Sequence, residues 1–295
     1  MATTQDWIAG ARPRTLPAAL APVIAGTAIA AYDGGGWAGG VVWWKAALAL
    51  VVALALQIGV NYANDYSDGI RGTDADRVGP MRLVGSGRAA PRVVLTAALL
   101  ALAVAAAAGL VLAATTNWWL LTIGAASIIA AWFYTGGKRP YGYLALGEVM
   151  VFVFFGLVAV VGTTYVQLER VPAAAWYAGV GIGALACAIL VVNNLRDILT
   201  DREADKLTLA VLLGADRTRG LYVLLALGAA VAVVAVASET TWRALVGLAF
   251  LVPLAKPLRI VLGKATGPAL IPVLQQTGVA ELLWAVLVGA ALFVG

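Results

Sequence analysis

The sequence of 295 residues contains no histidine and one cysteine, and only 12% of its residues are charged. The lack of histidine excludes histidine-based acid–base relays, Ser-His triads and histidine-ligated metal sites. The single cysteine, Cys187, lies in an apolar run and excludes an intramolecular disulfide framework. Any metal site must therefore use oxygen ligands, which suit Mg²⁺, Mn²⁺ or Ca²⁺.

Long apolar runs dominate the chain. Hydrophobic residues make up 62% of the sequence and the mean hydropathy is +0.91, whereas a soluble domain is about half apolar and about a quarter charged. A membrane-spanning helix needs roughly 20 apolar residues, so this length allows about nine spans with short loops. We predict a single all-α, polytopic membrane domain over residues 1–295, with nine transmembrane helices near 16–32, 41–63, 94–114, 118–135, 144–166, 174–193, 220–237, 242–261 and 269–294.

Positive charge is unevenly distributed along this chain, whose net charge is +5. Under that span assignment, all lysines and arginines except Lys45, Arg170 and Arg243 fall on one side of the membrane. Because basic loops stay on the cytoplasmic side, we predict a multi-pass protein of the inner (cytoplasmic) membrane with a cytoplasmic N-terminus. The same pattern assigns the positive charge to topology rather than to nucleic-acid binding. A cleaved signal peptide over the first apolar run is the alternative, and it would break this alternation.

Two predicted cytoplasmic loops carry clusters of acids and amides, at the inner ends of the second and sixth spans. Asn64 and Asp68 are four residues apart, and so are Asn193, Asp197 and Asp201 in turn. This spacing places side chains on one face of a helix. The offset from the first cluster to the second is the same for Asn64 and Asn193 as for Asp68 and Asp197, which indicates two related four-helix halves.

Carboxylates beside the apolar layer are costly. An acid at the bilayer centre costs about 2.5–3.5 kcal/mol, like charges four residues apart repel, and the C-terminal end of a helix is already negative. Divalent cations would relieve this repulsion, and Mg²⁺ binds through a few carboxylates together with substrate phosphates. The two clusters therefore indicate a binding site for Mg²⁺ and a diphosphate. The alternative is that these acids are solvated loop charges paired with nearby arginines.

Basic and aromatic residues lie close to the same surface. Arg71, Arg77, Arg82, Lys138, Arg139 and Lys206 are candidates for binding phosphate oxygens, although each cation also fits the positive-inside pattern. Tyr134, Tyr141 and Tyr143 are candidates for shielding an allylic cation or stacking on an aromatic acceptor. Their alternative role is that of interfacial membrane anchors.

These segments resemble the UbiA superfamily of intramembrane prenyltransferases over nearly the whole chain. Asn64-Asp65-x-x-Asp68 is similar to its first Asp-rich motif and Asp197-x-x-x-Asp201 to its second. The superfamily resemblance includes 12–17 (RPRTLP) near the start. The strings 76–82 (DRVGPMR), 139–143 (RPYGY), 193–202 and 206–214 are similar to the branch that prenylates 1,4-dihydroxy-2-naphthoate in menaquinone synthesis. The chain departs from the superfamily pattern at Gly72, where a third acid is common.

The resemblance implies nine helices around a central cavity and assigns the site residues. It implies that Asp65, Asp68, Asp197 and Asp201 are both Mg²⁺ ligands and catalytic residues. Asp74 is the nearest replacement for the missing third acid and is expected to be a further Mg²⁺ ligand. Diphosphate binding is expected at Asn64, Arg77, Arg82, Lys138, Arg139 and Lys206. The substrate cavity is expected to include Asn61, Tyr134, Tyr141, Tyr143, Asn193 and Asn194.

The implied activity is Mg²⁺-dependent transfer of a polyprenyl group from polyprenyl diphosphate to 1,4-dihydroxy-2-naphthoate. The acceptor would lose its carboxylate to give demethylmenaquinol, on the cytoplasmic side of the bilayer. Other aromatic acceptors (4-hydroxybenzoate or homogentisate), a membrane transporter and, more remotely, a CDP-alcohol phosphotransferase are the alternatives. Tail length, the general base, the oligomeric state and the roles of Glu148 and Glu281 are open from sequence.

Overall fold

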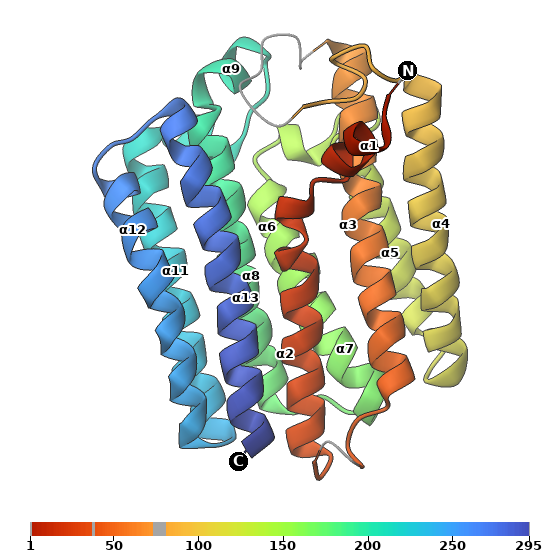
Figure 1. Cartoon of the computed structure of the whole chain (residues 1–295), viewed down its shortest axis with the longest axis vertical. Coiled ribbons are helices and arrows are strands. Elements are labelled where there is room, and N and C mark those ends of the chain that lie inside the picture. Colours follow the sequence, from red (N-terminus) through yellow and green to blue (C-terminus); the bar gives the residue numbers. More distant parts are fainter. Residues whose placement is uncertain (1, 37–38, 73–80, 295) are drawn as a thin grey trace.

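The computed structural model describes residues 2–36, 39–72 and 81–294, which form a bundle of long helices (Figure 1). Four of the long helices are continuous: α3 (Trp43–Arg71), α4 (Pro91–Thr115), α8 (Ala173–Arg196) and α11 (Ala215–Glu239). Three further long segments are composite: α6 (Gly147–Val151) with η3 (Phe152–Val158) and α7 (Ala159–Leu168), η4 (Trp242–Phe250) with α12 (Leu251–Leu262), and η5 (Gly267–Leu270) with α13 (Ile271–Val294).

Shorter helices complete the bundle. At the N-terminus, α1 (Thr4–Ala11) and η1 (Pro13–Thr15) meet α2 (Pro17–Asp33) at a bend of 50°. The remaining elements are α5 (Leu120–Phe133), η2 (Tyr141–Tyr143), α9 (Ile198–Glu203) and α10 (Leu209–Leu213). The β-type pairing in the described part of the chain is an isolated bridge between Leu144 and Leu207.

The all-helical, multi-span class is confirmed. Seven helical segments are long and apolar enough to cross a membrane, and the bent pair at the N-terminus raises the number to eight. The other predicted span corresponds to α5, which is apolar but has only 14 residues, fewer than the roughly 20 that a perpendicular span needs. The count of nine spans therefore stays a prediction.

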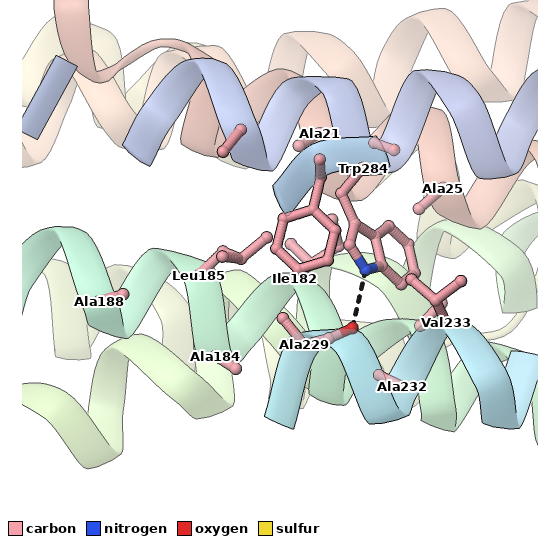
Figure 2. Packing of buried hydrophobic residues seen from close by; sticks show 14 of the residues in the cluster. Ala21, Ala25, Ile182, Ala184, Leu185, Ala188, Ala229, Ala232, Val233 and Trp284 are labelled. Carbon is pink, nitrogen blue, oxygen red and sulfur yellow. Dashed lines mark hydrogen bonds between the residues drawn. The ribbon is translucent and has the colours of Figure 1, made fainter. Parts of the chain in front are cut away.

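Small residues let the helices of the C-terminal half approach closely. Trp284 of α13 is fully buried, and Figure 2 shows its indole among alanine and valine side chains, with its N–H bonded to the carbonyl of Ala229 at 3.0 Å. A Cβ at Gly181 of α8 would lie 2.8 Å from the indole ring. Glycine at this position therefore allows the largest side chain of the core to pack against the α8 backbone.

The bend between α1 and α2 is fastened to α3 by one hydroxyl group. Thr15 Oγ1 donates to the carbonyl of Arg12 at 2.9 Å and accepts from Gln57 Nε2 at 2.8 Å and Asn61 Nδ2 at 3.1 Å. Asn61 Nδ2 also donates to the carbonyl of Ala11 at 3.0 Å. Gln57 and Asn61, on successive turns of α3, thus fix the start of α2. They also fix the segment before it, which carries Arg12 and Arg14.

This arrangement predicts that T15V destabilises the bundle whereas T15S does not. Valine has nearly the same shape but removes three hydrogen bonds, and interhelical hydrogen bonds in membranes average about 0.6 kcal/mol each. We expect T15V to lower the free energy of unfolding by about 1–2 kcal/mol and T15S to keep it. Thermal unfolding of the detergent-purified protein measures this, and equal melting temperatures for both variants would contradict it.

Candidate functional site

A cavity of about 900 Å³ runs inside the bundle. Its walls come from α2, α3, α4, α5, the 147–168 span and α8, with a contribution from the start of α13. The C-terminal ends of α3 and α8 point to the same end of the bundle, where α1 and α9 also lie (Figure 1). Its polar wall consists chiefly of Asn61, Asn64, Asp68, Arg82, Asn193, Asn194, Arg196 and Lys206. Residues of both clusters therefore line one cavity: Asn64 and Asp68 from the first, and Asn193 and Asn194 from the second. Asp197 and Asp201 are not part of its wall.

Deeper in the bundle the wall of the cavity is apolar. Val23, Ala49, Leu112 and Val166 pack together there, and all four line the cavity. They come from four different helices, α2, α3, α4 and α7. The cavity is thus a chamber with charged and amide groups at one end and a hydrocarbon surface along its depth, which suits an amphiphile with an anionic head.

The 147–168 span keeps one face toward this cavity over most of its length. Its lining residues recur every four positions, from Met150 to Val166. In a uniform α-helix, which turns about 100° per residue, Met150 and Val166 would point about 160° apart. The π-wound segment Phe152–Val158 rotates less per residue, so Phe154 and Phe155 stay in the same wall.

The first motif supplies two side chains to the cavity. Asn64 Oδ1 accepts from Thr135 Oγ1 at 2.7 Å, which fixes the amide. Asp68 accepts from Tyr143 Oη at 2.8 Å and pairs with Arg82 at 3.4 Å. Both side chains are buried, so these contacts compensate polar groups that have been removed from water.

Asp65 points elsewhere. Its two carboxylate oxygens accept from the backbone N–H groups of Leu83 at 2.7 Å and Val84 at 3.0 Å, and the residue is only 1% exposed. It is absent from the cavity wall described above. In this geometry Asp65 ties the 81–90 loop, which carries Arg82, to α3.

The second motif lies at a break between two helices. α8 ends at Arg196, α9 begins at Ile198, and Asp197 stands between them. The four-residue spacing predicts one continuous helix through Asp197 and Asp201. The structure instead has a break at Asp197. The amide of Asp201 nevertheless donates to the carbonyl of Asp197 at 2.8 Å, which preserves the separation of one turn.

Cations pair with both acids of this motif. Arg196 binds Asp197 through Nε and one terminal nitrogen, both at 2.6 Å, and also donates to Asn193 Oδ1 at 2.9 Å. Lys206 pairs with Asp201 at 3.3 Å. Asp68, Asp197 and Asp201 thus each have a basic partner that a diphosphate would also attract.

Tyr143 joins the two motifs. Its hydroxyl contacts Asp68, while Arg71 from the end of α3 and Lys206 each lie 5.5 Å from its ring centroid. Arg71 in turn donates to the carbonyls of Thr135 and Gly137. Tyr143 therefore separates two cations that would otherwise repel, and its ring face favours both of them.

Tyr134 and Tyr141 form part of the cavity wall, whereas Tyr143 does not. Their rings meet edge to face at 5.5 Å, and Tyr141 Oη donates to the carbonyl of Ala130 at 2.8 Å. Burial raises the pKa of Tyr141 above its ordinary value because the charged form would lose its hydration. Tyr141 therefore stays a neutral hydrogen-bond donor.

Other predicted site residues lie apart from the cavity or outside the described part of the chain. Lys138 and Arg139 are exposed, and neither belongs to the cavity wall. Asp74 and Arg77 lie outside the described residues. Asp197, Asp201 and Tyr143 are likewise absent from the cavity wall. The catalytic, metal-binding and substrate-binding roles assigned to all of the site residues stay predictions.

The structure adds residues that the sequence reasoning left out of the site. They are Arg12, Arg14, Thr15, Gln57, Thr135 and Arg196. The string RPRTLP and the Arg196-Asp197 pair were visible signals for four of these residues. Thr135 and Gln57 carry no local signal, because each becomes relevant only through a partner on another helix.

The donor chemistry of the polar end fits Mg²⁺. Within the residues that the structure describes, no group of three or more acids forms a ready-made metal cage. Mg²⁺ does not require one, since it commonly binds through one or two carboxylates plus phosphate oxygens and water. Asn64, Asp68, Asp197 and Asp201 supply the hard oxygen donors that such a shared site needs.

The position of Asp65 predicts a structural phenotype. Replacing it with alanine removes two charge-assisted hydrogen bonds, each worth about 1.5–3 kcal/mol. We expect D65A to speed hydrogen exchange in the 81–90 segment, with Leu83 and Val84 most affected, and to lower the melting temperature. Hydrogen-exchange mass spectrometry measures this, and unchanged protection at these two amides would show that Asp65 does not tether the loop.

Comparison with known proteins gives a consistent result. The model of the UbiA prenyltransferase family matches residues 19–269. The chain is 56% identical to the Mycobacterium tuberculosis protein named 1,4-dihydroxy-2-naphthoate octaprenyltransferase, covering 100% of this chain and 99% of that one. It is 37% identical to the Escherichia coli protein of the same name, covering 93% and 90%.

Solved structures share the fold at low identity. A UbiA homologue from Archaeoglobus fulgidus, bound to GPP and Mg²⁺, matches with a TM-score of 0.70 and 16% identity over 98% of this chain and 99% of that one. The apo UbiA homologue from Aeropyrum pernix matches with a TM-score of 0.71 and 14% identity over 94% and 97%. With the ends of both motif helices lining one cavity and a family match over most of its length, the chain belongs to the UbiA prenyltransferase family.

Proposed function

We propose that the protein transfers a polyprenyl group from polyprenyl diphosphate to 1,4-dihydroxy-2-naphthoate, giving demethylmenaquinol, diphosphate and CO₂. The observation that carries this proposal is the near-complete match, at 56% identity, to a relative named for octaprenyl transfer to this acceptor. The cavity supports it, because a charged end and an apolar depth fit a diphosphate joined to a hydrocarbon tail.

The charged end is suited to departure of the diphosphate. Arg82, Arg196 and Lys206 line the cavity and present fixed positive charge where negative charge accumulates on the leaving oxygen. Mg²⁺, held by Asn64, Asp68, Asp197 or Asp201 together with phosphate oxygens, would supply further neutralisation of that charge. Fixed charges of this kind need no reorganisation during the reaction.

The rest of the reaction depends on excluding water. When the carbon–oxygen bond breaks, its electron pair leaves with the diphosphate, and the ring of the acceptor forms the new carbon–carbon bond. The carboxyl group of the acceptor is then lost as CO₂ and a proton, and the electron pair of its bond to the ring restores aromaticity. The apolar walls that include Phe154 and Phe155 keep water from the allylic cation, while the ring faces of Tyr134 and Tyr141 lie in the same cavity and favour positive charge.

The distribution of basic residues supports a cytoplasmic position for the charged end. All lysines and arginines except Lys45, Arg170 and Arg243 lie in segments that the span assignment puts on the same side as the motifs. We assign the chain, as a single domain over residues 1–295, to the cytoplasmic membrane with its N-terminus inside. Both proposed substrates then reach the polar end from the cytoplasm or the inner leaflet.

The choice of acceptor is tested by labelling. Membranes containing the protein, Mg²⁺ and labelled polyprenyl diphosphate are incubated with 1,4-dihydroxy-2-naphthoate, 4-hydroxybenzoate or homogentisate. We expect label in the naphthoate product alone. Label in one of the other acids would assign a different acceptor, and flux of a solute into liposomes without any labelled product would indicate a transporter.

The metal role predicts a second result. D68N and D197N each remove a carboxylate proposed to hold Mg²⁺, and with it part of the positive charge that stabilises the departing diphosphate, an effect of about 3 kcal/mol and so on the order of 100-fold in kcat/KM. Both variants should also need more Mg²⁺ for half-maximal rate. The matched control is D33N, because Asp33 is likewise ion-paired, to Arg170, but outside the cavity wall. Full activity of D197N at unchanged Mg²⁺ requirement would remove the metal role of the second motif.

A further inference from the structure

A buried carboxyl group stands directly behind the cavity wall. Glu148 lies in the first turn of α6, is 7% exposed and does not itself line the cavity. Its Oε1 accepts a hydrogen bond from Asn194 Nδ2 at 2.9 Å, whereas Oε2 is buried without a hydrogen-bond partner among the described residues. Asn194, on α8, does line the cavity. Burying a carboxyl group here is costly, so its contact with Asn194 calls for a function.

The contact fixes which way the Asn194 amide faces. A carboxyl oxygen such as Oε1 accepts hydrogen bonds, so the NH₂ group of Asn194 must face Glu148. Because the amide is planar, its carbonyl oxygen then points away from Glu148. Asn194 therefore offers a fixed hydrogen-bond acceptor on the cavity side of the pair.

Asn194 marks the boundary between the polar end and the apolar depth. Arg196 and Asp197 follow it on the chain, whereas Leu190, one helical turn before it, lines the cavity with an apolar side chain. The reacting carbon of a prenyl diphosphate is bonded to the diphosphate, so the new bond must form just below the polar end. The acceptor ring has to lie at this boundary.

We propose that Glu148 is a positioning residue, which orients Asn194 so that its carbonyl oxygen accepts a hydrogen bond from a ring hydroxyl of the aromatic acceptor. This inference rests on the proposed function, since it needs a hydroxylated aromatic substrate. A hydroxyl that donates to the carbonyl gives more electron density to the ring, which makes the ring a better nucleophile toward an allylic cation. The pair also selects hydroxylated rings, because a buried acceptor left unpaired is costly.

Four variants separate this role from simple stabilisation. E148L removes the acceptor for Asn194 Nδ2 and should raise the KM for the aromatic acceptor about tenfold, the effect of one hydrogen bond, with the KM for polyprenyl diphosphate changed less than about twofold. E148Q should recover most of that loss, because the Oε1 atom of its side-chain amide can also accept from Asn194. N194D should impair the enzyme by placing two carboxyl groups together. The double variant E148Q/N194D should recover activity, because the amide introduced by E148Q can donate to the new carboxylate.

Glu281 provides the matched control. It is also a buried glutamate in an apolar helix, α13, with neither carboxyl oxygen hydrogen-bonded among the described residues, but it does not line the cavity. E281Q is expected to leave both KM values unchanged, whatever its effect on melting temperature. A change in acceptor KM in E281Q as large as that in E148L would overturn the assignment, because it would reflect general loosening of the bundle.

Substrate analogues give the decisive test. Methylating the relevant hydroxyl of 1,4-dihydroxy-2-naphthoate should lower kcat/KM of the wild type about tenfold. The same methylation should lower kcat/KM of E148L only slightly, because the hydrogen bond is already lost in that variant. The two monomethyl ethers identify which hydroxyl is bound. If the loss caused by E148L and the loss caused by methylation add for both ethers, Glu148 and Asn194 do not act on a hydroxyl.

The two proposals fail in different ways. If wild-type protein does not prenylate the dihydroxynaphthoate at all, the proposed function is wrong. If the wild type does so but E148L raises the KM of donor and acceptor equally, only the positioning role is wrong.

Discussion

The pairing of buried charge at one end of the bundle is the constraint on which the rest of the structure depends. Acids at the ends of two helices border an apolar interior, and removing a charge from water costs several kcal/mol unless it is paired and hydrogen-bonded. Arg82 meets Asp68, Arg196 meets Asp197 and Lys206 meets Asp201. The same cations are the groups that an incoming diphosphate would bind, so the interactions that stabilise this end of the bundle also prepare it for an anionic substrate.

The helices and the motif positions could be predicted from the sequence, because both are local signals. Apolar runs of about 20 residues define spans, and the four-residue spacing of Asn64 and Asp68 places them on one face of α3, as the structure shows. The break at Asp197 could not be predicted in this way. A four-residue spacing survives across a helix break when one backbone hydrogen bond continues, so the pattern does not distinguish one helix from two.

The partners of these residues could not be predicted, because they come from distant segments. Thr135 reaches Asn64 from 71 positions away, and the amides of Leu83 and Val84 bind Asp65 across a loop. No periodicity in the sequence records such contacts. For the same reason the sequence does not distinguish Asp65 from Asp68, although the carboxylate of Asp65 faces a loop rather than the cavity.

Close backbone approach explains how the fold persists while side chains change. Within the 147–168 span, a Cβ at Gly156 would lie 2.5 Å from the carbonyl oxygen of Gly179 and 2.6 Å from Cα of Gly183 on α8. Packing of this kind depends on small residues and on helix geometry rather than on particular large side chains. Solved relatives with 14–16% identity can therefore share the fold over nearly the whole chain.

The two ends of the cavity should discriminate between substrates to different degrees. At the polar end, recognition depends on hydrogen bonds and ion pairs with fixed directions, and a site built to bind a hydroxyl rejects an analogue that lacks it by a large factor. Along the depth, recognition depends on contact between apolar surfaces, where one methylene changes binding by only about 1–3 kcal/mol. Since Phe154 and Phe155 offer no polar group to the tail, the structure favours strict selection of the aromatic acceptor and weaker selection of tail length.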